Sequence, residues 1–224
     1  DEIKDALDRV LVSGNYILSE EVKVFEENFA KYVGTKYAVG VNSGTDALTL
    51  SLKALDVGYG NEVITTPNTF IATVGAIVDT GAKPVFVDVR EDYNINPDLI
   101  EEKITERTKA IIPVHLTGRP ADLESITKLA NKHNLYVIED AAQSIGAKYK
   151  EQKVGSFGTT GCFSLHPLKN LNVMGDAGVI TTNNHEIYDK LLKLRNHGLK
   201  DRDVCDCFGY NSRMDSIHAA IANL

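Results

Sequence analysis

The 224-residue sequence predicts an α/β fold with a largely parallel central sheet that helices cover on both faces. Two observations predict it. Segments with strand-like and helical patterns alternate along the chain. Most strand-like segments are continuously apolar, which is typical of parallel strands that are buried on both sides. Such sheets bind their ligands beyond the carboxyl ends of the strands, and polar residues able to bind a ligand follow several of these segments.

The first half of the sequence opens with two helical patterns and then alternates between the two kinds of segment. Apolar residues at helical spacing predict helices over residues 3–11 and 22–33, and Ser19 is a suitable cap for the second. Strands are then predicted at 37–41, 63–66 and 84–89, each followed by a helix at about 47–55, 69–78 and 99–104.

The second half continues the alternation. Further strands are predicted at 110–115, 135–138 and 177–182, and further helices at 123–130, 187–194 and 215–224. Pro113 indicates the end of its strand, because proline cannot donate to a sheet ladder. We find no internal repeat and no linker, so we expect one large domain over residues 1–224.

Composition and charge exclude several classes of protein. The net charge of −7, with no basic run, argues against a nucleic-acid or acidic-membrane partner. No apolar stretch reaches the length of a membrane span. The three cysteines cannot all pair, and Cys205 and Cys207 are too close for an ordinary bridge, so we expect a cytoplasmic protein. Their spacing does not match a metal site, so no metal is expected.

One lysine follows the apolar run that begins at Cys162. Apolar neighbours would disfavour the charged ammonium of Lys169, lower its pKa and make a nucleophilic amine available. Such an amine can form a Schiff base with an aldehyde or ketone. The alternative is an ordinary solvated lysine in a loop.

The segment 43–45 joins a predicted strand to the start of a helix. Exposed amides and the helix dipole at such a position suit a phosphate, and Gly44 lets an anion approach the backbone while Thr45 adds a hydroxyl donor. The alternative is a simple helix cap by Ser43 or Thr45. The segment matches neither a dinucleotide-binding fingerprint nor a Walker loop, which argues against NAD and ATP.

Asp140 directly follows an apolar strand, so we expect it to be at least partly buried and to need a compensating partner. A protonated pyridine nitrogen is one such partner, and a nearby cation or a backbone turn is another. Gln143 could reach the same ligand or bond to backbone. Phe70 could stack on a planar ring or belong to the core.

Taken together and in this order, the motifs resemble those of the DegT/DnrJ/EryC1/StrS family of sugar aminotransferases, which use pyridoxal 5′-phosphate (PLP). The resemblance covers nearly the whole chain, and it rests on the segments 42–48, 66–70, 139–143, 163–169 and 209–214.

The resemblance implies a role for each residue. Lys169 would carry PLP as a Schiff base, Asp140 would pair with the pyridinium nitrogen, and Gln143 would contact the ring oxygen. Phe70 would cover the ring. The phosphate would be bound by Gly44, Thr45, Asp46 and Ser164 and, from the neighbouring subunit, by Asn211.

The implied fold is the large domain of PLP-dependent transferases of fold type I. The implied reaction moves an amino group from L-glutamate to a keto sugar on a nucleotide diphosphate, with pyridoxamine phosphate as the intermediate form of the cofactor. Such a reaction belongs to amino-sugar biosynthesis for polysaccharides or antibiotics. A homodimer with shared active sites is implied as well.

The sequence departs from the family at some points. Family members continue into a small carboxyl-terminal domain, which we expect this chain to lack, and with it part of the substrate site. Ser212 and Thr117 stand where aromatic residues are common, so both could tune the sugar pocket. His166 could assist proton transfer, contact the sugar or be structural. A non-catalytic PLP-binding or regulatory protein, or a plain interaction domain, are the alternative functions.

Overall fold

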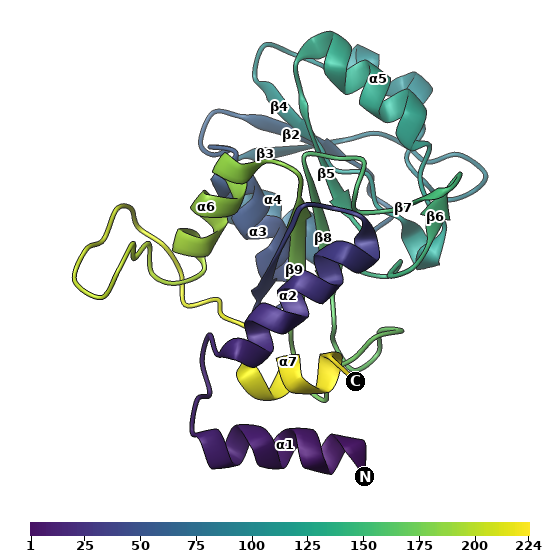
Figure 1. The fold of residues 1–224 in the computed structure, drawn as a ribbon. Coiled ribbons are helices and arrows are strands. Elements are labelled where there is room, and N and C mark those ends of the chain that lie inside the picture. Colours follow the sequence, from purple (N-terminus) through teal and green to yellow (C-terminus); the bar gives the residue numbers. More distant parts are fainter.

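The computed structural model describes residues 1–224 and contains a seven-stranded sheet in the order β1-β9-β8-β5-β4-β2-β3 (Figure 1). Four of the six strand pairings are parallel, and β9 alone runs against the other strands because it pairs antiparallel with both β8 and β1. The strands are β1 (Tyr37–Val41), β2 (Glu62–Thr65), β3 (Lys83–Phe86), β4 (Thr108–Ile111), β5 (Tyr136–Asp140), β8 (Thr160–Ser164) and β9 (Gly178–Thr182).

Helices cover both faces of this sheet, as the apolar strands predict. The helices are α1 (Glu2–Ser13), α2 (Glu20–Val33), α3 (Gly44–Ala54), α4 (Ile71–Asp79), α5 (Leu123–His133), α6 (His185–Leu194) and α7 (Ser216–Ala222). None of them has the length and apolar character that a membrane-crossing segment needs.

The alternation of side chains along each strand divides the core into two sides. Cys162 and Ile180 pack with α3, α4 and α6 in one apolar cluster, whereas Phe163 and Val179 pack with α2 and α7 in another. A third cluster lies under α5 and includes Val137 of β5. The carboxyl ends of β1, β5 and β8 therefore lie at one edge of a sheet that is held firmly from both faces.

Some predicted elements differ from the structure. Residues 99–104 do not form one helix but two short 3₁₀ turns, Pro97–Leu99 and Glu101–Lys103, since Pro97 starts the first turn. The strand predicted at 84–89 is β3, which already ends at Phe86. A small hairpin of β6 (Lys148–Tyr149) and β7 (Gln152–Lys153) lies outside the main sheet and was not predicted.

Candidate active site

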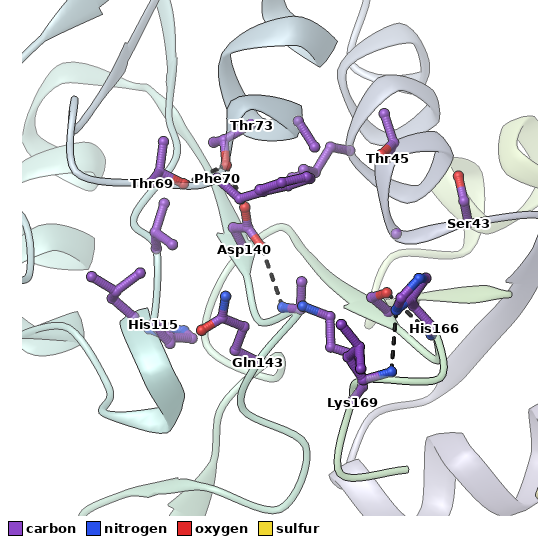
Figure 2. A pocket seen from close by; sticks show the side chains of 18 of the residues that line it. Ser43, Thr45, Thr69, Phe70, Thr73, His115, Asp140, Gln143, His166 and Lys169 are labelled. Carbon is purple, nitrogen blue, oxygen red and sulfur yellow. Dashed lines mark hydrogen bonds between the residues drawn. The ribbon is translucent and has the colours of Figure 1, made fainter. Parts of the chain in front are cut away.

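A cavity of about 690 Å³ opens at the carboxyl ends of β1, β5 and β8. This is the edge at which parallel α/β sheets bind ligands. The structure brings eight of the predicted site and cap residues to its wall: Ser43, Gly44, Thr45, Phe70, Asp140, Gln143, Ser164 and Lys169 (Figure 2). The independent sequence motifs therefore converge on one site.

The wall near β1 is the start of α3. Ser43 caps this helix, because its Oγ accepts a hydrogen bond of 3.0 Å from the amide of Asp46. The amides of Gly44 and Thr45 remain unpaired in the first turn, and they form the kind of anion site that a helix N-terminus provides. A Cβ atom on Gly44 would lie only 2.7 Å from Cβ of Ser164, so glycine lets the helix start approach β8 closely.

The lysine turn follows β8. Phe163 and Leu165 lie in the apolar core on the α2 side of the sheet, and they anchor the strand from which the turn departs. The turn is closed by a hydrogen bond of 2.8 Å from the amide of Lys169 to the carbonyl of His166. The side chain of Lys169 is half-buried and faces the cavity, whereas the neighbouring Leu168 is 88% exposed.

His166 also lies at the cavity wall, but part of its role is structural. Its Nδ1 accepts a hydrogen bond of 3.2 Å from the amide of Leu168. This bond places the ring proton of the neutral imidazole on Nε2. His166 therefore helps to shape the lysine turn, and only Nε2 remains free for a ligand.

Asp140 ends β5 and is almost fully buried, with 6% of its surface exposed. Burial raises the pKa of this carboxyl above its ordinary value, and hydrogen bonds from Thr73 and Ala142 and the charges of His115 and Lys169 oppose the rise. The bond from Thr73 Oγ is 2.7 Å long and the bond from the amide of Ala142 is 3.2 Å long. A buried carboxylate of this kind is suited to a cationic partner in the cavity.

Gln143 is oriented by a backbone group. Its Oε1 accepts a hydrogen bond of 3.1 Å from the amide of Thr117, a residue in the left-handed conformation with φ of 48°. The side-chain NH₂ group of Gln143 is therefore the part left free to donate to a ligand. Thr117 itself lies at the cavity wall.

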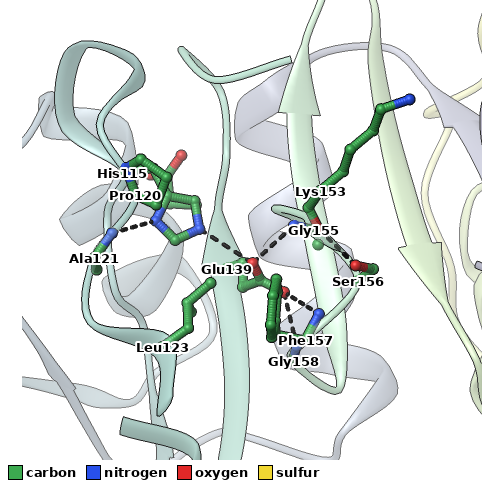
Figure 3. Close-up of polar contacts among 12 residues, drawn as sticks. His115, Pro120, Ala121, Leu123, Glu139, Lys153, Gly155, Ser156, Phe157 and Gly158 are labelled. Carbon is green, nitrogen blue, oxygen red and sulfur yellow. Dashed lines mark hydrogen bonds and ion pairs between the residues drawn. The ribbon is translucent and has the colours of Figure 1, made fainter. Parts of the chain in front are cut away.

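Behind the cavity lies a polar network that sequence reasoning did not identify (Figure 3). Nε2 of His115 lies 3.1 Å from Oε2 of Glu139, and neither side chain has exposed surface. The amide of Ala121 donates to Nδ1 of His115 at 3.1 Å, so the neutral imidazole carries its proton on Nε2 and donates to Glu139. The Glu139 carboxylate also accepts bonds of 2.7, 2.8 and 2.7 Å from the amides of Gly155, Phe157 and Gly158.

Three other predicted residues are not brought into this chain's cavity. The carboxylate of Asp46 accepts a hydrogen bond of 2.6 Å from Ser212 Oγ, and both side chains lie outside the cavity wall. Asn211 is exposed and also lies away from the cavity. Ser212 is buried, with 1% of its surface exposed, and it ties the segment around Asn211 to the start of α3.

Thr73 and His115 line the cavity and Glu139 supports His115 from behind, and sequence analysis did not identify any of these three roles. The sequence positions of two of them give a weak indication of a place in the site. Thr73 lies in the first turn of the helix that follows Phe70, and His115 ends a predicted strand at the ligand-binding edge. Their partners, however, lie far away in the sequence.

The donor set fits PLP. Two free amides at a helix start suit the phosphate, a buried carboxylate suits the pyridinium nitrogen, and a lysine amine suits the aldehyde. The exposed ring of Phe70 forms one side of the cavity, with 68% of its surface accessible to a stacking partner.

Comparison with known proteins agrees with this geometry. The sequence is 51% identical to a dTDP-3-amino-3,6-dideoxy-alpha-D-galactopyranose transaminase from Aneurinibacillus thermoaerophilus, covering 100% of this chain and 62% of that protein. It is 48% identical to a protein from Geobacillus stearothermophilus named as a pleiotropic regulatory protein, covering 100% of this chain and 60% of that protein.

The solved structure of DesV from S. venezuelae, determined in complex with a ketimine intermediate, superimposes with a TM-score of 0.97 at 44% identity. It covers 99% of this chain and 60% of that one. The chain thus spans between 60% and 62% of the length of these relatives.

The fold of the chain is that of PLP-dependent aminotransferases, as its solved relatives show. The profile of the DegT/DnrJ/EryC1/StrS aminotransferase family matches residues 1–224. The motifs, the cavity and the comparisons lead to one conclusion, that this chain belongs to the DegT/DnrJ/EryC1/StrS aminotransferase family.

Proposed function

We propose that the protein is a PLP-dependent aminotransferase that moves an amino group from L-glutamate to a keto sugar carried on a nucleotide diphosphate, in amino-sugar biosynthesis. The observation that carries the proposal is the cavity itself. It joins the amine of Lys169 to the buried carboxylate of Asp140 and the free amides at the start of α3. The names of transaminase relatives support the substrate class.

Each residue has a defined task in this proposal. Lys169 would hold the cofactor as a Schiff base through Nζ, and its amine, released when the amino donor takes its place, would move a proton at the α carbon of that donor. Asp140 stabilises a positive ring nitrogen, while Gly44, Thr45 and Ser164 bind the phosphate. When bound, PLP supplies the electron sink that stabilises negative charge at the α carbon.

Phe70 and Gln143 orient the cofactor. The ring of Phe70 would cover one face of the pyridine, and the free NH₂ group of Gln143 would donate to the ring oxygen. We also include a homodimer with shared active sites and a cytoplasmic location in the proposal. Exposure of Asn211 outside its own cavity supports the first, and the three free cysteines support the second.

Addition of L-glutamate to the PLP-loaded protein tests the function. The absorbance of the bound cofactor should change to that of the pyridoxamine form, and a panel of 3-keto and 4-keto nucleotide sugars should identify the sugar that reverses the change. Lys169→Ala is the control that should not respond.

A regulatory role is the second candidate, and the name of one relative favours it. A protein that binds PLP without responding to L-glutamate would support this role and contradict the transaminase. A colourless protein that takes up no PLP would contradict both and leave an interaction domain.

A further inference from the structure

Two threonine hydroxyls lead to Asp140, one from Thr73 in the first turn of α4 and one from Thr69 just before this helix. Thr73 Oγ donates to Oδ2 of Asp140 at 2.7 Å, and Oγ of Thr69 lies 2.7 Å from Oγ of Thr73 (Figure 2). Thr73 is buried, with 1% of its surface exposed, and both threonines line the cavity.

The charge of Asp140 fixes the direction of both hydrogen bonds. A threonine hydroxyl has one proton, and an ionised carboxylate can only accept. Because Thr73 gives its proton to Asp140, Thr69 must donate to Thr73. Protonation of Asp140 would allow both bonds to reverse, so the hydroxyl orientations and the charge of Asp140 are linked.

The other groups around Asp140 do not replace Thr73. The Oδ1 atom accepts one longer bond of 3.2 Å from the amide of Ala142. The titratable groups that face Asp140 are His115, Lys169 and the buried thiol of Cys162. Both ring nitrogens of His115 are bonded elsewhere, to Glu139 and to the amide of Ala121, and the amine of Lys169 would be used for attachment of PLP. Thr73 is therefore the main side-chain donor that keeps the buried carboxylate ionised.

We propose that Thr73 is the positioning residue that holds Asp140 ionised beneath the ring nitrogen of the cofactor, with Thr69 fixing the direction of its hydrogen bond. This inference rests on the proposed function. Removing the hydroxyl of Thr73 should move the shared proton from the ring nitrogen toward Asp140. One hydrogen bond to a charged group is worth roughly 1.5 kcal/mol or more, which corresponds to about a tenfold change in that equilibrium.

The test uses the intact protein loaded with PLP that carries ¹⁵N at the ring nitrogen. In Thr73→Val, the ¹⁵N resonance should move toward the position of neutral pyridine, and the half-reaction with L-glutamate should slow about tenfold. Thr73→Ser keeps the hydroxyl. Its ¹⁵N resonance should lie at the wild-type position, and its half-reaction rate should lie within about threefold of the wild-type rate. Asp140→Asn should move the resonance as well, which shows that the probe responds.

Thr80→Val is the matched control. Thr80 lies at the other end of the same helix and is buried. Its hydroxyl donates to the backbone carbonyl of Ile77 at 2.7 Å and accepts from the amide of Ala82 at 3.4 Å, so both of its partners are backbone groups. This variant should leave the ¹⁵N resonance unchanged. An unchanged resonance in Thr73→Val, while Asp140→Asn moves it, would overturn the inference and leave the proposed function intact. Absence of bound cofactor in the wild type would overturn both.

Discussion

At the scale of single residues, Asp140 is a carboxylate that the fold buries without an ion pair of its own. We therefore predict that Asp140→Asn impairs the reaction, because an amide cannot supply the negative charge that favours a protonated ring nitrogen. Anchoring through Lys169 and the phosphate site should keep the variant loaded at saturating PLP. The half-reaction with L-glutamate should slow by about 10² or more, as measured by stopped-flow absorbance.

Asp56→Asn is the control for this prediction, since Asp56 lies at the surface with 82% of its side chain exposed. It should react with L-glutamate at the wild-type rate. A half-reaction in Asp140→Asn that is as fast as in the control would rule out the role assigned to Asp140.

Glu139 points away from the cavity and serves the scaffold. It accepts four hydrogen bonds with no exposed surface. In Glu139→Gln, the NH₂ group would face backbone donors that then lose their acceptor, so the free energy of unfolding should fall by roughly 2–4 kcal/mol. Urea denaturation measures the loss.

The surface variant Glu151→Gln, in the turn of the β6–β7 hairpin, is the matched change and should alter the free energy of unfolding by less than about 0.5 kcal/mol. Equal stability of the two variants would contradict the structural role of Glu139.

Sequence reasoning reached some residues of the site and not others, for a physical reason. Asp140 ends the apolar strand β5 and Lys169 lies in the turn after β8, so their placement at the ligand-binding edge could be predicted from the local pattern. The partners of Asp140 and Glu139 lie 67 and 24 residues away, at Thr73 and His115. Such contacts depend on strand order and on helix packing, which a local pattern does not encode.

At the scale of elements, the start of α3 is sensitive to an added atom. In Gly44→Ala, the new Cβ would lie 2.7 Å from Cβ and 3.2 Å from Cα of Ser164. The helix start must move away from β8, which displaces the two free amides. We expect PLP to bind at least about tenfold more weakly and the free energy of unfolding to fall by about 1–3 kcal/mol. Fluorescence titration and urea denaturation measure the two effects.

Gly75→Ala is the matched change within a helix, because a Cβ at Gly75 of α4 meets nothing within 4 Å. It should bind PLP normally and gain up to about 1 kcal/mol in the free energy of unfolding. Normal PLP binding in Gly44→Ala would refute the assignment of this helix start as the phosphate site.

Most helices and strands could be predicted, because the apolar residues that recur along the sequence are the ones that these elements bury. The reversed direction of β9 could not be predicted, since its apolar pattern is that of any buried strand. The 3₁₀ turns after Asn96 also differ from the predicted helix. Pro97 starts the first turn, and the side chain of Asn96 accepts a hydrogen bond of 3.1 Å from the amide of Asp98. Both features favour a tight turn.

At the scale of the whole molecule, the exposed position of Asn211 leads to a prediction about assembly. Asn211 lies on a segment that Ser212 ties to the start of α3, and it does not line its own cavity. In a two-fold dimer, such a segment can reach the partner's site. Mixed dimers test this. One chain would carry Lys169→Ala and the other Asn211→Asp, whose carboxylate should repel the phosphate.

Each variant homodimer should be nearly inactive. If Asn211 acts across the interface, one site of the mixed dimer carries both changes and the other carries neither, so about half of the wild-type activity should return in that species. If Asn211 acts within its own chain, both sites remain damaged. Activity no higher than that of the homodimers would contradict the shared site.

The proposed function depends above all on Lys169 as the amine that holds PLP at the cavity. Borohydride reduction of the PLP-loaded protein, followed by proteolysis and mass spectrometry of the peptides, tests it most directly, because reduction turns the Schiff base into a stable bond. We expect a pyridoxyl group on the peptide that contains Lys169, and no label in Lys169→Ala. A pyridoxyl group on another lysine, or an unlabelled wild-type protein, would contradict it.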